Sequence, residues 1–196
     1  MKHGGFDLAV RVLAVLLILG CGGHILLRAL REPGGVLALP AERPDMAAVT
    51  VLPAGVPPGP WQRIIIHHSG TTGSSYEEIK IALGKLGYNE VPFHFLVRPE
   101  GAVRVTWSWQ QQVQCPSTPD ADTNRQAIAI CVIGDFAQLE ERPAPAQMES
   151  LVRLVTTIMR TYGIRQRYVW RGADDSPGAQ FPWNSFLKQL PKDTGT

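Results

Sequence analysis

Two adjacent histidines, His67 and His68, directly follow a run of three isoleucines. The segment Arg63–His68 is predicted to be a buried β-strand, because β-branched apolar residues favour strands and a glycine follows at position 70. A strand end is a rigid platform, and imidazoles held there suit metal binding or proton transfer. The sequence therefore predicts a chemical site at the carboxyl end of this strand.

Composition and charge limit the classes of function. The chain has 196 residues, enough for one domain with attachments. A net charge of +2 with no basic cluster gives no support for a nucleic-acid partner. Cys21, Cys115 and Cys131 lie far apart and form no CxxC pair, so neither a zinc knuckle nor a disulfide framework is indicated.

The first 30 residues are predicted to be a targeting segment. Residues 12–27 are apolar and are flanked by basic residues on both sides. A non-cleaved signal anchor is the favoured interpretation; a lipoprotein signal around Cys21 and a cleaved signal peptide are the alternatives. The anchored domain is expected on the extracytoplasmic side of the membrane, in the cell envelope.

Residues 31–60 contain seven of the sixteen prolines and several glycines. Such a composition is typical of a semi-extended tether. The folded domain is therefore expected to start near Trp61 and to end near Leu190, leaving residues 191–196 as a tail.

Helical and strand patterns alternate along residues 61–190. The helix over 145–162 has the clearest apolar periodicity, and Gly163 is expected to end it. This alternation predicts an α/β fold with a central mixed β-sheet flanked by helices. The other expected elements are strands at 93–97, 103–107, 126–134 and 167–170 and helices at 76–86 and 183–190.

Five sequence blocks in this order resemble the zinc-dependent N-acetylmuramoyl-L-alanine amidases, whose fold is shared by the peptidoglycan recognition proteins. The blocks are residues 64–69, 92–97, 124–136, 145–148 and 176–178. The resemblance covers residues 61–190. It implies a groove for the peptide stem of peptidoglycan and a zinc ion held by three protein ligands with one open position.

The ligand set that the resemblance implies is incomplete in this chain. His67 matches the first ligand, at the end of the first strand. Trp170 or Arg171 stands where the second ligand, a histidine, is expected. Ser176 takes the place of the third ligand before Pro-Gly, and Asp175 is the neighbouring residue that would have to replace it.

Other family positions have also changed. The family-position candidates for catalysis are His67, Phe93 and Asp174, and none is assigned a catalytic role. Phe93 lacks the hydroxyl of the tyrosine expected there. His94 is interpreted as a hydrogen-bonded sheet residue. Cys115, on a loop expected to line the groove, is interpreted as an exposed or half-exposed thiol without a catalytic role.

The resemblance also implies that such a groove can bind peptidoglycan without zinc. Tryptophans suit such recognition because they bury a large area at little entropic cost. The residues predicted to line the binding groove are Trp107, Trp109, Cys115, Asn124, Trp170 and Arg171.

The sequence thus predicts a peptidoglycan (muropeptide) recognition domain that has lost zinc-dependent hydrolysis, tethered to a membrane and needing no cofactor. Two alternatives remain. One is an active zinc amidase that uses His67 with Asp174 or Asp175 and Cys115. The other is a module that binds a protein partner.

Overall fold

The structure is a computed structural model that describes residues 49, 51–71, 75–85, 87–137, 141–172 and 176–193. These residues all belong to one compact unit, residues 41–196. The predicted anchor, residues 1–30, lies outside the described residues. Within the described part, no helix is both long enough and apolar enough to cross a membrane.

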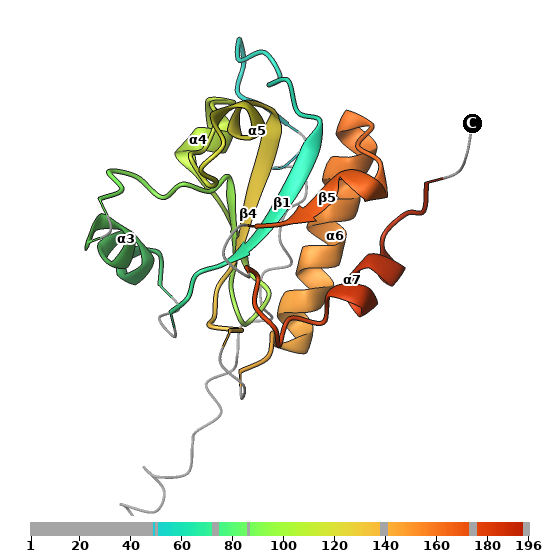
Figure 1. The fold of residues 1–196 in the computed structure, drawn as a ribbon. Helices are drawn as coiled ribbons and strands as arrows, with labels where there is room; N and C mark the ends of the chain where they lie inside the picture. Colours follow the sequence, from blue (N-terminus) through green and yellow to red (C-terminus); the bar gives the residue numbers. More distant parts are fainter. Residues whose placement is uncertain are drawn as a thin grey trace, which may run out of the picture. The chain divides into compact units, whose positions relative to one another are not determined.

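The described strands form one mixed sheet in the order β3-β2-β4-β1-β5 (Figure 1). β4 pairs in parallel with β1 and β2, β5 pairs in parallel with β1, and β3 is antiparallel to β2. The predicted mixed sheet is therefore confirmed. The strands are β1 (Arg63–His68), β2 (Phe95–Val97), β3 (Val103–Val105), β4 (Ala127–Val132) and β5 (Val169–Arg171).

Helices cover both faces of this sheet (Figure 1). α6 (Pro145–Tyr162) and α7 (Trp183–Gln189) pack on one face, where Ile64, Ile66 and Leu154 belong to the larger core cluster. α3 (Tyr76–Lys85) packs on the other face through Ile79. All six residues of β4 are buried, as expected for a central strand covered on both sides.

Local sequence signals explain where the helices begin and end. The Ser75 hydroxyl accepts a hydrogen bond from the Glu78 N–H, and the Glu78 carboxylate accepts one from the Ser75 N–H. This reciprocal capping box starts α3. Gly163 has a φ of 66° at the end of α6, a left-handed conformation that glycine adopts without strain.

The sequence-based boundaries differ from the structure in several places. Trp107, expected at the end of a strand, begins the short helix α4 (Trp107–Gln110). A second short helix, α5 (Ala121–Gln126), precedes β4 and was not predicted. Val49 is buried in the core and Leu52 packs against it, so part of the segment assigned to the tether contributes side chains to the domain.

One lateral row of paired residues runs across the sheet from β3 to β1. Arg104 of β3 is paired with Leu96, Leu96 with Cys131, and Cys131 with His67. Residues in register on adjacent strands project from the same face. Adjacent strands are about 4.8 Å apart, so the backbones of Arg104 and His67 are separated by roughly 14 Å.

Candidate binding site at the end of strand β1

His67 is a buried histidine with an unused ring nitrogen. The side chain is 5% exposed, and its Nε2 has no hydrogen-bond partner among the described residues. Burial, reinforced by the nearby His68, lowers the pKa of His67 to about 4. The imidazole is therefore neutral at pH 7 and can donate to or accept from a bound group.

A cavity of about 370 Å³ opens beside this imidazole. Most of its lining side chains carry a hydroxyl or an imidazole, so it offers hydrogen bonds more than apolar contact. The lining residues come from the end of β1, from the segment after α3, from the loop before the short helix at 121–126 and from the segment after β5. They are His67, His68, Ser69, Gly70, Tyr88, Ser117, Thr118, Pro119 and Ser176.

Asn124, predicted to bind ligand, holds one wall of this cavity in place. Its side-chain oxygen accepts hydrogen bonds from the Thr118 N–H at 3.0 Å and from the Thr118 hydroxyl at 2.9 Å. Its amide nitrogen donates to the Thr118 carbonyl at 2.8 Å. Asn124 is buried and is not among the lining residues, so it acts on the cavity through the position of Thr118.

The residue beside His67 on the neighbouring chain segment is Gly172. Its N–H donates to the Ile66 carbonyl, which continues the pairing of β5 with β1 by one residue. A Cβ added to Gly172 would lie 2.3 Å from His67 Nδ1, closer than any real contact. Glycine is the residue that fits here, and no side chain can project from this position toward His67 without a shift of the backbone or the ring.

Trp170 and Arg171, proposed at the second ligand position, lie away from His67. Trp170 is in register with Ile65, and the guanidinium of Arg63 stacks on its ring at 4.5 Å. Arg171 is next along the strand, and its guanidinium lies 5.1 Å from the Trp183 ring. The structure therefore brings neither of them to the histidine.

Ser176, at the third ligand position, does reach the cavity. Its Oγ accepts a hydrogen bond from the His68 N–H at 3.0 Å, so this hydroxyl already has a structural partner. Asp174 and Asp175 lie outside the described residues. Among the residues that the structure describes, no three His, Cys, Asp or Glu side chains gather around one point. The described donors thus do not fit the three-ligand zinc site of the resemblance.

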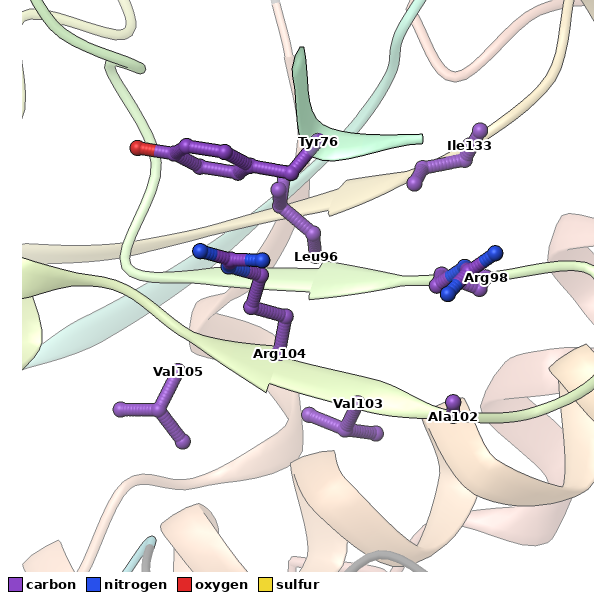
Figure 2. Close-up of a pocket in the computed structure, with 8 residues that line it drawn as sticks. All are labelled: Tyr76, Leu96, Arg98, Ala102, Val103, Arg104, Val105 and Ile133. Atoms are coloured by element: carbon purple, nitrogen blue, oxygen red, sulfur yellow. The ribbon is translucent and has the colours of Figure 1, made fainter. Parts of the chain in front are cut away.

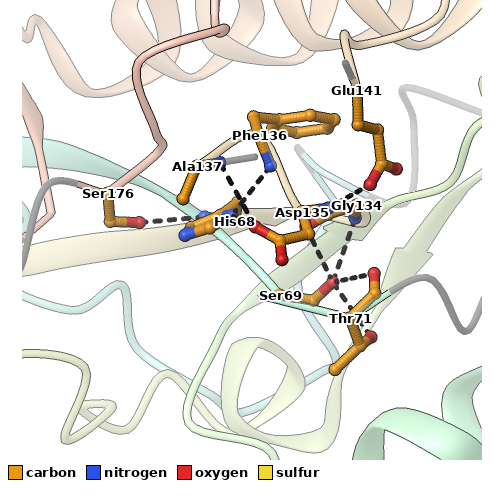
Figure 3. Close-up of polar contacts among 9 residues, drawn as sticks. All are labelled: His68, Ser69, Thr71, Gly134, Asp135, Phe136, Ala137, Glu141 and Ser176. Atoms are coloured by element: carbon orange, nitrogen blue, oxygen red, sulfur yellow. Dashed lines mark hydrogen bonds and ion pairs between the residues drawn. The ribbon is translucent and has the colours of Figure 1, made fainter. Parts of the chain in front are cut away.

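His68 belongs to a network that joins the ends of β1 and β4 (Figure 3). Its Nδ1 accepts from the Phe136 N–H at 3.2 Å, which requires the neutral ring with the proton on Nε2. The same nitrogen is 3.8 Å from the Asp135 carboxylate, an ion pair only for a protonated ring. The hydrogen bond is the shorter of the two contacts.

Ser69 continues this network. Its hydroxyl accepts from the Gly134 N–H at 3.0 Å and has Thr71 within 3.3 Å (Figure 3). Glu141 accepts from the Asp135 N–H at 2.9 Å. These contacts hold the cavity rim in place on the β4 side.

Phe93 and Cys115 both lie in the smaller core cluster. The Phe93 ring is 5.3 Å from the His67 ring and supplies no polar atom. The expectation of an exposed or half-exposed Cys115 is wrong, because the side chain is 1% exposed. Burial raises the pKa of its thiol to about 12, so it stays protonated.

The three candidate groove tryptophans have different environments. Trp109 is 1% exposed and packs 4.6 Å from Phe95 in the core, so its expected place on the groove surface is wrong. Trp107 is 62% exposed on α4, and Trp170 is 37% exposed on β5. These two keep an accessible ring.

Sequence reasoning missed Tyr88 and Gly172. Tyr88 lines the cavity from the segment after α3, and nothing in its sequence context marks it. Gly172 had a signal, since a glycine next to a strand end often permits close approach of another group.

Comparisons with known proteins agree with this architecture. The model of the N-acetylmuramoyl-L-alanine amidase family matches residues 57–179. A comparison with curated proteins finds no match. Since the family model spans more than half of the chain, the protein belongs to the N-acetylmuramoyl-L-alanine amidase family.

Solved structures share the fold at low sequence identity. The amidase LysC from Clostridium intestinale URNW is 23% identical, with a TM-score of 0.58 over 67% of this chain and 85% of that one. Drosophila PGRP-LB is 20% identical, with a TM-score of 0.52 over 74% and 93%. AmiD from E. coli, in complex with anhydro-N-acetylmuramic acid-L-Ala-D-gamma-Glu-L-Lys, is 20% identical, with a TM-score of 0.54 over 70% and 60%.

Proposed function

We propose that this domain recognises the muropeptide part of peptidoglycan in the cavity beside His67 and does not hydrolyse it through zinc. The observation that carries the proposal is the contact of Gly172 with His67, which leaves no room for a second ligating side chain at that place. The occupied hydroxyl of Ser176 supports it, because that residue stands where a third ligand is expected.

The chemistry of the cavity suits such a ligand. Muropeptides combine sugar hydroxyls with peptide amides, so they need many donors and acceptors. The cavity supplies the free Nε2 of His67 together with the hydroxyl-bearing residues Ser117, Thr118 and Tyr88. A buried polar atom without a partner is costly, and a ligand hydrogen bond to His67 would remove that cost.

Trp170, on β5 two residues before Gly172, is the proposed aromatic contact outside this cavity. Its ring is 37% exposed, and Arg63 stacks on it at 4.5 Å. The Nε1–H of Trp170 donates to the Arg167 carbonyl at 2.9 Å, which fixes the orientation of the ring. A fixed, half-exposed indole is a suitable surface for a sugar ring or a peptide.

Co-sedimentation of the full-length protein with purified sacculi tests the recognition. We expect Trp170→Ala to weaken binding about tenfold, the effect of losing one aromatic anchor. Ile81→Ala removes an exposed apolar side chain from α3 and is expected to change nothing. EDTA is also expected to leave binding unchanged. Absence of binding by the parent protein would contradict recognition and favour the protein-partner module.

Zinc content tests the loss of hydrolysis. After purification in zinc and desalting, we expect far less than one equivalent, because His67 is the only described residue at a family ligand position that can ligate zinc well. A full equivalent that disappears in His67→Ala would overturn this part of the proposal.

That outcome would favour the alternative of an active zinc amidase, to which the free Nε2 of His67 gives some support. The ligands would be His67 with Asp174 or Asp175 and Cys115. Cys115 is a poor candidate, since a thiol with a pKa of about 12 must lose its proton before it can ligate a metal.

The setting of the domain is part of the proposal and rests on the sequence alone. The apolar residues 12–27 fit a membrane anchor, and the proline-rich residues from 31 up to the core residue Val49 fit a tether. Such an arrangement would hold the domain on the extracytoplasmic side of the membrane, within reach of the cell wall.

A further inference from the structure

A second hollow lies between α3 and the β2–β3 hairpin, away from the His67 cavity. It has a volume of about 390 Å³. Its lining residues are Tyr76 of α3, Leu96, Arg98 and Ile133 from the central strands and their ends, and Ala102, Val103, Arg104 and Val105 of the hairpin (Figure 2). No step of the proposed peptidoglycan recognition uses these residues.

The hollow combines positive charge with an apolar floor. Leu96 and Ile133 are almost fully buried and form the floor. Arg104 and Arg98 lie at opposite ends, with Leu96 between them (Figure 2). An anion with a compact apolar body would meet complementary groups on both parts of this surface.

Arg104 is the guanidinium available to such an anion. It stacks on the Tyr76 ring at 3.9 Å, and no carboxylate among the described residues pairs with it. Arg98 is already paired, with its Nε 2.9 Å from the Glu100 carboxylate. Arg104, Arg98 and Glu100 together therefore carry one net positive charge. Stacking holds Arg104 in place without using its N–H groups, which stay free to donate.

The sheet register separates this hollow from the first cavity. Arg104 and His67 belong to the same lateral row, at its β3 and β1 positions, roughly 14 Å apart. Between them in this row lie Leu96 and Cys131, which share a core cluster with Ile79 of α3. α3 thus packs over the middle of the row, and the two hollows are distinct sites.

We propose that the hollow between α3 and the β2–β3 hairpin is a binding site for a carboxylate with a compact apolar body, with Arg104 as the anion-binding residue. The carboxylate receives paired N–H donors from the Arg104 guanidinium, and the apolar body covers Leu96 and Ile133. The assignment does not depend on peptidoglycan recognition, because it uses other residues and another surface.

Titration of N-acetyl-leucine into the full-length protein, followed by NMR, tests the site. We expect shifts of the Leu96 and Ile133 methyl signals. The neutral analogue N-acetyl-leucine amide is expected to bind at least tenfold more weakly, because a guanidinium bonds a charged acceptor more strongly than a neutral one. Equal binding of the acid and the amide would overturn the role of the charge.

Substitutions test whether Arg104 is the residue that binds the carboxylate. Arg104→Gln is expected to weaken N-acetyl-leucine binding about tenfold or more. Arg160→Gln removes an exposed guanidinium from α6 and is the matched control, with no change expected. Unchanged affinity of Arg104→Gln, with circular dichroism confirming its fold, would contradict the proposal.

Inorganic phosphate separates a general oxyanion site from the proposed one. It carries charge without an apolar body, so we expect it to bind more weakly than N-acetyl-leucine and to leave the methyl signals of the floor unshifted. Phosphate binding as tight as that of N-acetyl-leucine would overturn the role of Leu96 and Ile133.

Discussion

Two buried histidines with nearly the same low pKa have opposite surroundings. His94 Nδ1 accepts from the Ala129 N–H at 2.9 Å, and its Nε2 donates to the Val113 carbonyl at 3.0 Å. His67 Nε2 has no such partner and faces a cavity. Burial is the main cause of the low pKa of about 4 in both. The low pKa therefore does not distinguish the two histidines, whereas the unused ring nitrogen of His67 beside a cavity does.

Acidification should destabilise both regions and gives the largest expected effect. Each histidine has a folded pKa of about 4 against 6.5 in the unfolded chain. The unfolded state therefore binds more protons between these values. The stability that comes from keeping the two rings neutral is fully present above pH 6.5. It is lost as the pH falls toward 4, by up to about 1.4 kcal/mol per pH unit for each histidine.

Urea unfolding between pH 6.5 and 5, above the range where most carboxylates titrate, measures this slope. In His67→Ala the slope of the free energy of unfolding against pH should fall by about the contribution of one histidine. A stability that does not change across this range would contradict the buried, neutral state of both rings.

Removal of the two rings should separate their roles. His94→Ala leaves the Ala129 N–H and the Val113 carbonyl without partners and opens a hole beside Trp61 and Trp109. We expect a loss of about 3 kcal/mol or more in the free energy of unfolding. His67→Ala breaks no described hydrogen bond of Nε2 and borders an open cavity, so about 1 kcal/mol is expected. Equal losses at pH 7.5 would remove the distinction between the two regions.

Gly172→Ala tests the close approach to His67. The added methyl would lie 2.3 Å from Nδ1, so the ring or the backbone must shift, at a cost of about 1–3 kcal/mol. The same substitution in a His67→Ala background should cost much less. A double-mutant cycle by urea unfolding measures the difference, and additive losses would show that the two residues do not meet.

Ser176→Ala is expected to have the smallest effect on the free energy of unfolding. It removes the acceptor of the His68 N–H, and we expect a loss of about 1 kcal/mol. Ser185→Ala, at an exposed position of α7, is the control with little change expected. Should both variants unfold at the same urea concentration as the parent, the hydroxyl of Ser176 would be free to serve a ligand.

The elements with strong local patterns were predictable. The bounds of β1 and α6 follow the sequence-based prediction, because an isoleucine run and an amphipathic 18-residue stripe each have one favourable conformation. The segment Val103–Trp107 alternates like a strand, but tertiary packing ends β3 at Val105 and places Trp107 in a helix. Short elements depend on such packing more than on their own pattern.

His67 and Ser176, which the sequence singled out as family ligand positions, both line the cavity, while their role there stays a prediction. The environments of Trp109 and Cys115 were not predictable, because residue type alone does not tell which side of a loop meets the core. The register of β5 was also hidden, and a shift of two residues decides whether Trp170 or Gly172 stands beside His67.

The tight contact of Gly172 also limits how a metal site could be engineered into this protein. A histidine introduced at position 172 would stand next to His67, where a partner ligand is wanted. Its Cβ would collide with the imidazole that it has to assist. A single substitution there is therefore expected to fail, and a design would first have to move the backbone after β5 away from β1 or bring its second ligand from another segment.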